Sequence, residues 1–118
     1  MRLSQEERDL GSLGDILEMC TRIHDLLAHK KFPTYIENPT MRAATERWIE
    51  IVGEASNRLS KETKSQISVS WEVFRVFRNE LAHEYDTLDD LAVWNIATKE
   101  IPHLFKKITD HLKSFPSP

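Results

Sequence analysis

Residues 38–59 read NPTMRAATERWIEIVGEASNRL, and they carry the clearest helical pattern in the chain. Asn38 can cap the first turn, and Pro39 suits the first helical position, where the missing N–H would be unpaired anyway. Apolar residues then recur every three or four positions, which is typical of a helix with one buried face. That predicted face comprises Met41, Ala44, Trp48, Ile51, Val52, Ala55 and Leu59. We interpret Gly53 as a point of close packing by a neighbouring helix.

The sequence before this stretch predicts a helix over residues 4–30. Ser4 and Glu7 have the spacing of a capping box at its start. Gly11 and Gly14 weaken the first turns, so a bend or a late start is compatible with the pattern. Residues 31–39 contain two prolines and are expected to break the helical periodicity. The predicted buried face of this helix comprises Leu10, Leu13, Leu17, Cys20, Ile23 and Leu27.

Two more helices are expected after residues 60–70, a polar stretch that reads as a loop or a short helical turn. The first covers about 70–85, with Val73, Phe74, Phe77 and Leu81 on its apolar side. The acidic residues of 86–90 can cap the second, which Pro102 should kink or restart. Its predicted core face comprises Leu91, Trp94, Ala97, Ile101, Leu104, Phe105, Ile108 and Leu112. The chain is therefore predicted to be all-α.

The composition fits one small domain over residues 1–118, with 115–118 as a frayed tail. A net charge of −3 indicates that any contact with nucleic acid is local. Cys20 is the single cysteine, so no internal disulfide can form. No signal peptide or apolar run long enough to span a bilayer is recognised, and a cytoplasmic protein without membrane contact is expected.

Candidate chemistry is concentrated in residues 78–85, RNELAHEY. On a helix, Arg78 and Tyr85 share one stripe, while Asn79 and His83 share the adjacent one. Taken alone, such spacing also fits a solvated helix face. The five histidines have no metal-ligand spacing with Cys, Asp or Glu, and no phosphate-binding glycine loop is present. We therefore expect no metal and no cofactor.

A wider pattern surrounds this motif. IVGEA at 51–55 precedes it, and LDDLAVWNI at 88–96 and IPHL at 101–104 follow it. Together with R-N-x-x-x-H-x-Y-D at 78–86, these blocks resemble the HepT family of HEPN proteins over nearly the full chain. The resemblance implies a four- to five-helix up-and-down bundle of HEPN type that forms a homodimer with the motifs facing a shared cleft. It also implies a metal-independent endoribonuclease toxin of a type II/VII-like toxin–antitoxin pair.

The same resemblance implies roles for individual residues. His83 can transfer protons near neutral pH, and Arg78 can stabilise the negative charge of a transition state on phosphorus. Asn79 would orient the imidazole or a phosphate oxygen, and Glu54 would pair with an arginine across the cleft. Tyr85 occupies the position to which an MNT-type nucleotidyltransferase antitoxin transfers AMP. The alternative is a non-catalytic HEPN dimer that binds nucleotide or such a nucleotidyltransferase.

Overall fold

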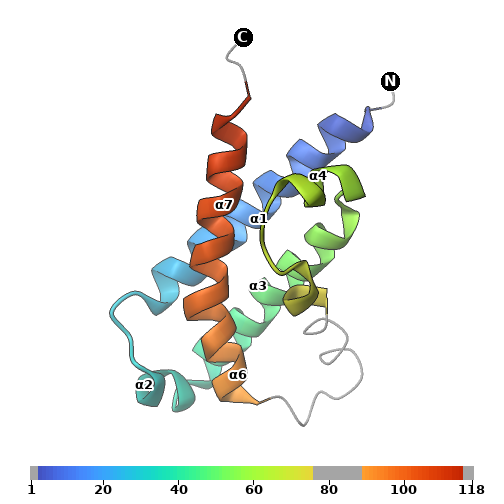
Figure 1. The fold of residues 1–118 in the computed structure, drawn as a ribbon. Coiled ribbons are helices and arrows are strands. Elements are labelled where there is room, and N and C mark those ends of the chain that lie inside the picture. Colours follow the sequence, from blue (N-terminus) through green and yellow to red (C-terminus); the bar gives the residue numbers. More distant parts are fainter. Residues whose placement is uncertain (1–2, 76–88, 116–118) are drawn as a thin grey trace.

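The computed structural model describes residues 3–75 and 89–115, which form helices joined by short connections (Figure 1). This confirms the all-α prediction. None of the described helices is both long and apolar enough to cross a membrane. The helical segments are α1 (Gln5–Leu27), α2 (Phe32–Ile36), α3 (Pro39–Arg58), α4 (Lys61–Gln66), residues 71–75, α6 (Asp90–Asn95), the π-helical turn η2 (Ile96–Glu100) and α7 (Ile101–Lys113).

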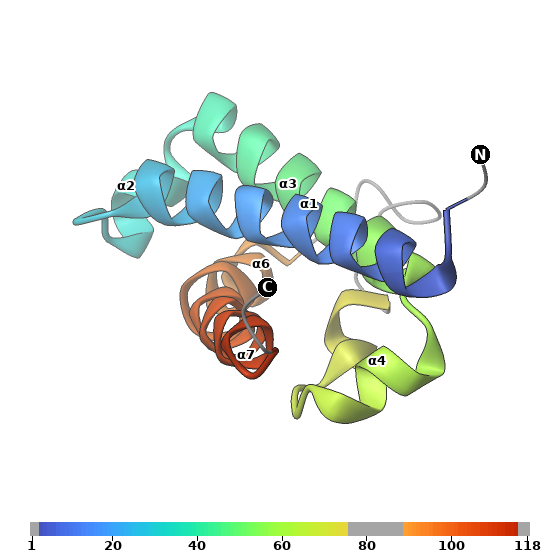
Figure 2. The same ribbon diagram turned by 90° about the horizontal axis from the view of Figure 1, so that it is seen from above.

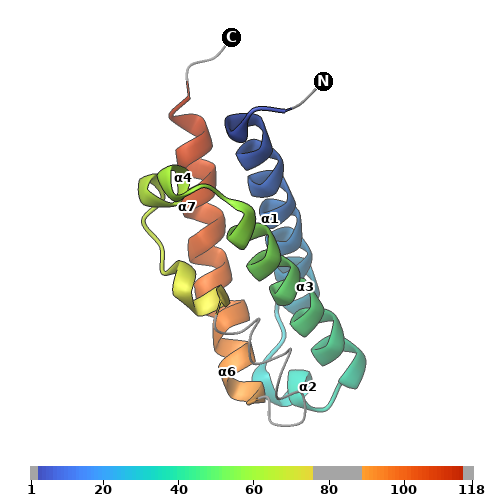
Figure 3. The same ribbon diagram turned by 90° about the vertical axis from the view of Figure 1, so that its right-hand side faces the viewer.

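The centre of the fold is the packing of α1 against α3 and α7. In Figure 2, α1 and α3 lie side by side, and α7, seen nearly end-on, covers one side of this pair. Figure 3 shows the same arrangement from the side, with α6, η2 and α7 following one another as one long helical column. The fully buried side chains of these three helices include Ile16, Ile23, Ile49, Val52, Leu104 and Ile108.

The capping box predicted for α1 is confirmed. The Glu7 backbone N–H donates to Ser4 Oγ at 3.1 Å, and the Ser4 N–H donates to Glu7 Oε1 at 3.1 Å. The helix ends at Leu27, earlier than predicted, and His29 adopts the left-handed φ of 63°. The prediction that Leu10 is buried is wrong, because the residue is 41% exposed. The buried face instead runs through Leu13, Ile16, Met19, Cys20, Ile23 and Leu27.

In α3, the predicted cap is confirmed, since Asn38 Oδ1 accepts from the Met41 N–H at 3.0 Å. The buried face is rotated relative to the prediction, so that Thr45 and Ile49 are 0% exposed. The predicted core residues Ala44, Trp48 and Ile51 are only half-buried. A hydroxyl can be buried here because Thr45 Oγ1 donates to the Met41 carbonyl at 2.8 Å.

The predicted break at residues 31–39 contains a short helix, α2, that the sequence analysis missed. Pro33 lies in its first turn, where proline favours a helix start. Tyr35 is 0% exposed, and its ring centroid lies 5.2 Å from that of Trp94 in α6. The ring centroid of Phe32 lies 6.0 Å from that of the same indole, so an aromatic cluster joins α2 to α6.

The last helical column begins as predicted, with the Asp89 side chain accepting from two N–H groups of the first turn. The predicted restart near Pro102 is confirmed, because η2 precedes α7 and Pro102 lies in the first turn of α7. A wider turn there accommodates the proline ring, which would clash with the preceding turn of a regular α-helix. Leu91 and Phe105, predicted to be in the core, are 50% and 41% exposed.

A buried carboxylate attaches α4 to α1. Asp9 is 4% exposed, and its oxygens accept from the Ser60 N–H at 3.1 Å and from the hydroxyls of Ser60 and Thr63, each at 2.6 Å. Burial alone would raise the pKa of this carboxyl, but the hydrogen bonds from Ser60, Thr63 and Gln5 outweigh burial and lower it from 3.8 to about 2. The ionised form of Asp9 therefore stabilises the folded chain.

We expect Asp9→Asn to lower the free energy of unfolding at pH 7 by about 1–2 kcal/mol, because the amide cannot accept all of these hydrogen bonds. The folded-state pKa lies below the ordinary value. The stabilisation by Asp9 is therefore complete above about pH 4 and is lost as the pH falls towards 2. Urea unfolding of both proteins at several pH values measures this difference. Asp15→Asn is the matched control on the same helix, and an equal loss in both variants would contradict the prediction.

Candidate active site

The predicted site residues Arg78, Asn79, His83 and Tyr85 all lie within residues 76–88, outside the part of the chain that the structure describes. The structure does describe both neighbours of this segment. Arg75 precedes Arg78 by three residues, and Asp89 follows Tyr85 by four. The contacts of residues 64–75 and 89–95 therefore decide how the motif is joined to the fold.

The segment before the motif is attached to the core by aromatic side chains. Trp71 Nε1 donates to the Lys64 carbonyl at 3.2 Å. Ile67, which lies between these two residues in the sequence, is buried. Phe74, one helical turn after Trp71, is 1% exposed. Arg75 forms an ion pair with Glu72 on the surface of the same turn. The helical residues 71–75 are thus packed against the core.

The segment after the motif is attached by an ion pair and by stacking aromatic rings. Arg42 in α3 lies 3.8 Å from Asp90 Oδ2, and both side chains are about one-third exposed or less. Trp94, one turn further along α6, packs on Tyr35. The start of α6 is therefore connected to α3 by charge and to α2 by aromatic packing.

These attachments create a polar cluster of Tyr35, Arg42, Glu46 and Asp90. Burial raises the pKa of the Tyr35 hydroxyl, and the charges of Glu46 and Asp90 act in the same direction. Burial also raises the pKa of Glu46, and the neighbouring Asp90 adds to this effect. One guanidinium thus faces two carboxylates. Neither the Tyr35 hydroxyl nor Arg42 Nε has a hydrogen-bond partner in the structure as described.

Sequence reasoning did not identify this cluster. Arg42 and Glu46 have the spacing of a pair on one helix face, which is a weak signal because such pairs are common on surfaces. Tyr35 lies in the stretch that was expected to be irregular. The cluster depends on α2 and α6 meeting at the end of α3, which is a tertiary contact.

Glu54, predicted to support the site, lies on α3 with its side chain 37% exposed. Its Oε1 is 3.6 Å from a guanidinium nitrogen of Arg47, which also pairs with Glu50. The Glu54 carboxylate is therefore accessible, and its cationic partner, Arg47, lies on the same helix. Within residues 3–75 and 89–115, no three potential metal ligands are grouped closely enough to hold an ion.

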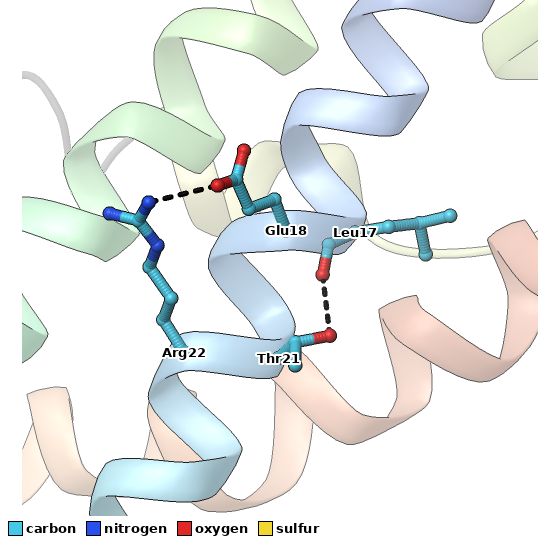
Figure 4. A network of polar contacts seen from close by, with 4 residues as sticks. All are labelled: Leu17, Glu18, Thr21 and Arg22. Atoms are coloured by element: carbon cyan, nitrogen blue, oxygen red, sulfur yellow. Dashed lines mark hydrogen bonds and ion pairs between the residues drawn. The ribbon is translucent and has the colours of Figure 1, made fainter.

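A separate apolar groove of about 450 Å³ lies between α1 and the η2–α7 column. Cys20 is part of its floor and is 2% exposed, and burial raises the pKa of its thiol to about 12. Thr21 lines the groove, but its hydroxyl donates to the Leu17 carbonyl at 3.0 Å, as Figure 4 shows. In the same view, Glu18 and Arg22 form an ion pair on the other side of α1. The groove is lined mainly by apolar side chains, and His24 at its edge is the one imidazole among its described lining residues.

Comparison with known families adds the decisive observation. The model of the family described as "Ribonuclease HepT-like" matches residues 16–110, from the middle of α1 to the last turns of α7. The chain belongs to the HepT-like ribonuclease family. The matched range includes Glu54 and all of the motif at 78–85, and the all-α architecture of the described residues agrees with this membership.

Individual relatives match over a similar range. A protein of Caldanaerobacter subterraneus subsp. tengcongensis named "Putative RNase" is 31% identical over 102 residues, covering 86% of this chain and 91% of that protein. A Methanocaldococcus jannaschii protein of the same name is 29% identical over 104 residues, covering 86% and 95%. The "Probable ribonuclease HepT" of Thermococcus cleftensis is 27% identical over 93 residues, covering 78% and 84%. The search of solved structures found no match.

The raised pKa of Glu46 leads to a prediction of opposite sign to that for Asp9. Since the folded-state pKa lies above the ordinary value of 4.5, the contribution of Glu46 to stability falls as the pH rises through this range. We therefore expect Glu46→Gln to melt at a higher temperature than the natural protein at pH 7, and this gain to shrink towards pH 4. Thermal unfolding followed by circular dichroism measures both values.

The matched control is Glu50→Gln, one turn along the same helix. Its carboxylate pairs with Arg47, so this variant should gain nothing at pH 7. A lower melting temperature for Glu46→Gln at pH 7 would mean that attraction to Arg42 outweighs burial and repulsion by Asp90.

Proposed function

We propose that this protein is a metal-independent endoribonuclease in which Arg78 and His83 carry the chemistry. The observation that supports it most strongly is the Arg–x₄–His pair within a chain that matches the HepT-like ribonuclease family over residues 16–110. Both residue types suit the cleavage of RNA without a metal. His83 supplies a group that titrates near neutral pH, and Arg78 supplies a permanent cation.

The proposed reaction is an internal transesterification. The ribose 2′-OH attacks the adjacent phosphorus, the bond to the 5′-oxygen breaks, and a 2′,3′-cyclic phosphate and a 5′-hydroxyl end are formed. A base must accept the 2′-OH proton, and an acid must protonate the leaving oxygen. His83 serves in this proton transfer, Arg78 binds the developing phosphorane charge, and Asn79 orients the imidazole or a phosphate oxygen.

A homodimer completes this proposal. A two-fold axis would bring two copies of Arg78 and His83 to one cleft and so supply both an acid and a base. Glu54, accessible on α3, would hold an arginine of the other protomer in place of Arg47. The described segments on both sides of residues 76–88 are attached to the core of each protomer.

We expect the purified protein to cut single-stranded RNA in the presence of EDTA and to leave 2′,3′-cyclic phosphate ends. Arg78→Ala and His83→Ala should each reduce the rate by at least about a hundredfold, the range for losing a transition-state donor or a general acid–base group. Gel analysis of end-labelled RNA measures rate and product ends, after light scattering has established that each variant is still a dimer.

Arg75→Ala is the matched control, because its ion pair with Glu72 is exposed and lies on the same segment. Cleavage that stops with EDTA and returns with a divalent ion would contradict the mechanism. Intact dimers that bind nucleotide or a nucleotidyltransferase but never cut RNA would favour the non-catalytic alternative.

We further propose that the protein is the toxin of a toxin–antitoxin pair and that Tyr85 is its point of control. A partner nucleotidyltransferase of MNT type would bind ATP and magnesium and catalyse attack of the Tyr85 hydroxyl on the α-phosphorus. Pyrophosphate leaves, and AMP remains attached to the phenolic oxygen. The new phosphate would compete with RNA for Arg78, and the adenosine would fill the cleft.

After incubation with the partner, ATP and magnesium, mass spectrometry should show the addition of AMP to the natural protein and not to Tyr85→Phe. The modified protein should remain a dimer and lose RNA cleavage. Tyr35→Phe is the control, since its buried hydroxyl should not be a substrate. Addition of AMP to Tyr85→Phe would place the acceptor elsewhere.

A further inference from the structure

A shallow hollow of about 590 Å³ lies where the segment before residue 71 meets the last helical column. Ser68, Val69 and Ser70 form one wall, and side chains of η2 and α7 form the other. Figure 1 shows these two segments, yellow-green and orange, next to each other. The hollow is separate from the apolar groove between α1 and α7, and it shares no lining residue with it.

The lining is chemically mixed in a way that suits one unit of an RNA strand. Lys99 brings a positive charge, and the Ser68 and Ser70 hydroxyls and the His103 imidazole can donate hydrogen bonds. These groups match the oxygens of a phosphate. Glu100 brings a carboxylate, which accepts hydrogen bonds and cannot donate them when ionised. It matches the 2′-OH of a ribose, the group that distinguishes RNA from DNA.

Both walls are held by buried contacts, so the hollow belongs to the folded core and not to a loose surface segment. On one side, Ile67 is 3% exposed and the Trp71 indole donates to the Lys64 carbonyl. On the other, Ile101 and Leu104 are at most 1% exposed and hold the start of α7. The polar residues of both walls are mostly exposed.

We propose that this hollow is a binding subsite for one ribonucleotide unit of the RNA substrate. Lys99, with Ser68, Ser70 and His103, binds the phosphate, and Glu100 accepts a hydrogen bond from the ribose 2′-OH. The subsite rests on the proposed ribonuclease function and deepens it, because it assigns a place to RNA away from the cleaved bond. It also explains how a chain with a net charge of −3 binds RNA through a local contact.

The position of the hollow along the chain agrees with this role. Ser70 precedes Arg78 by eight residues. Eight residues of fully extended chain span at most about 29 Å, so Ser70 and Arg78 lie within that distance of each other. A short RNA strand covers such a distance and can occupy both places.

The first test measures the binding of a short fluorescent single-stranded oligoribonucleotide by anisotropy. The protein carries His83→Ala, which prevents cleavage of the probe. Lys99→Met should weaken binding by about tenfold, the size of one lost charge-assisted hydrogen bond. The slope of log affinity against log salt concentration should also fall by about 0.7, the contribution of one phosphate on a single strand. Lys113→Met, at an exposed lysine that ends α7 in the same helical column, is the matched control and should change neither value.

The second test uses the deoxyribonucleotide of the same sequence. Glu100→Gln removes a negative charge near the phosphate and weakens acceptance from the 2′-OH. DNA binding should therefore tighten while RNA binding does not, and the RNA preference should fall by about fivefold. An unchanged preference would overturn the assignment of Glu100.

Cleavage by the protein with His83 intact separates this inference from the proposed function. If the natural protein cuts RNA and Lys99→Met cuts it with unchanged KM and kcat, the subsite is wrong and the ribonuclease proposal stands. If Lys99→Met weakens RNA binding as expected but the natural protein never cuts RNA, the subsite stands and the catalytic proposal is wrong. An increase in KM with little change in kcat for Lys99→Met supports both.

Discussion

The apolar face of α1 is buried between α3 and α7, and the other described elements are attached to the three-helix core that this burial creates. Ile16 and Ile23 on α1 are 0% exposed and lie two turns apart, so the contact extends over much of the helix. Removing apolar surface from water is the main favourable term in folding, and close packing makes it specific. Once α1, α3 and α7 are assembled, their ends define where shorter segments can attach.

Those attachments use polar and aromatic contacts in place of a second core. At one end, the Asp9 carboxylate holds α4 through the hydroxyls of Ser60 and Thr63. At the other end, Trp94 packs on the rings of α2, and Asp90 pairs with Arg42. A carboxylate buried without donors would be costly, so each of these contacts works only in the assembled geometry.

The proposed catalytic motif lies in the sequence between two attached segments. Trp71 and Phe74 fix the chain before residue 76, and Asp89 and Trp94 fix it after residue 88. The hollow at Ser68 and Lys99 lies on the same supported frame.

The sequence by itself determined the all-α class, the start of each long helix and the family to which the chain belongs. These features depend on neighbours three or four residues apart: the caps at Ser4, Asn38 and Asp89 were predicted correctly for that reason. The motif at Arg78 and His83 was also visible in the sequence, because its residue types and spacing are local properties.

Only the tertiary structure decided which side of each helix is buried and which polar groups meet. Periodicity favoured Leu10, Leu91 and Phe105 as core residues, yet all three are exposed because no described element covers those positions. Thr45 and Asp9 are buried although their side chains are polar, since partners from the same helix and from α4 satisfy them. The cluster at Arg42 and the hollow at Lys99 join segments about 30 to 50 residues apart in the sequence. Such contacts depend on long-range packing, and a local pattern of residues does not predict them.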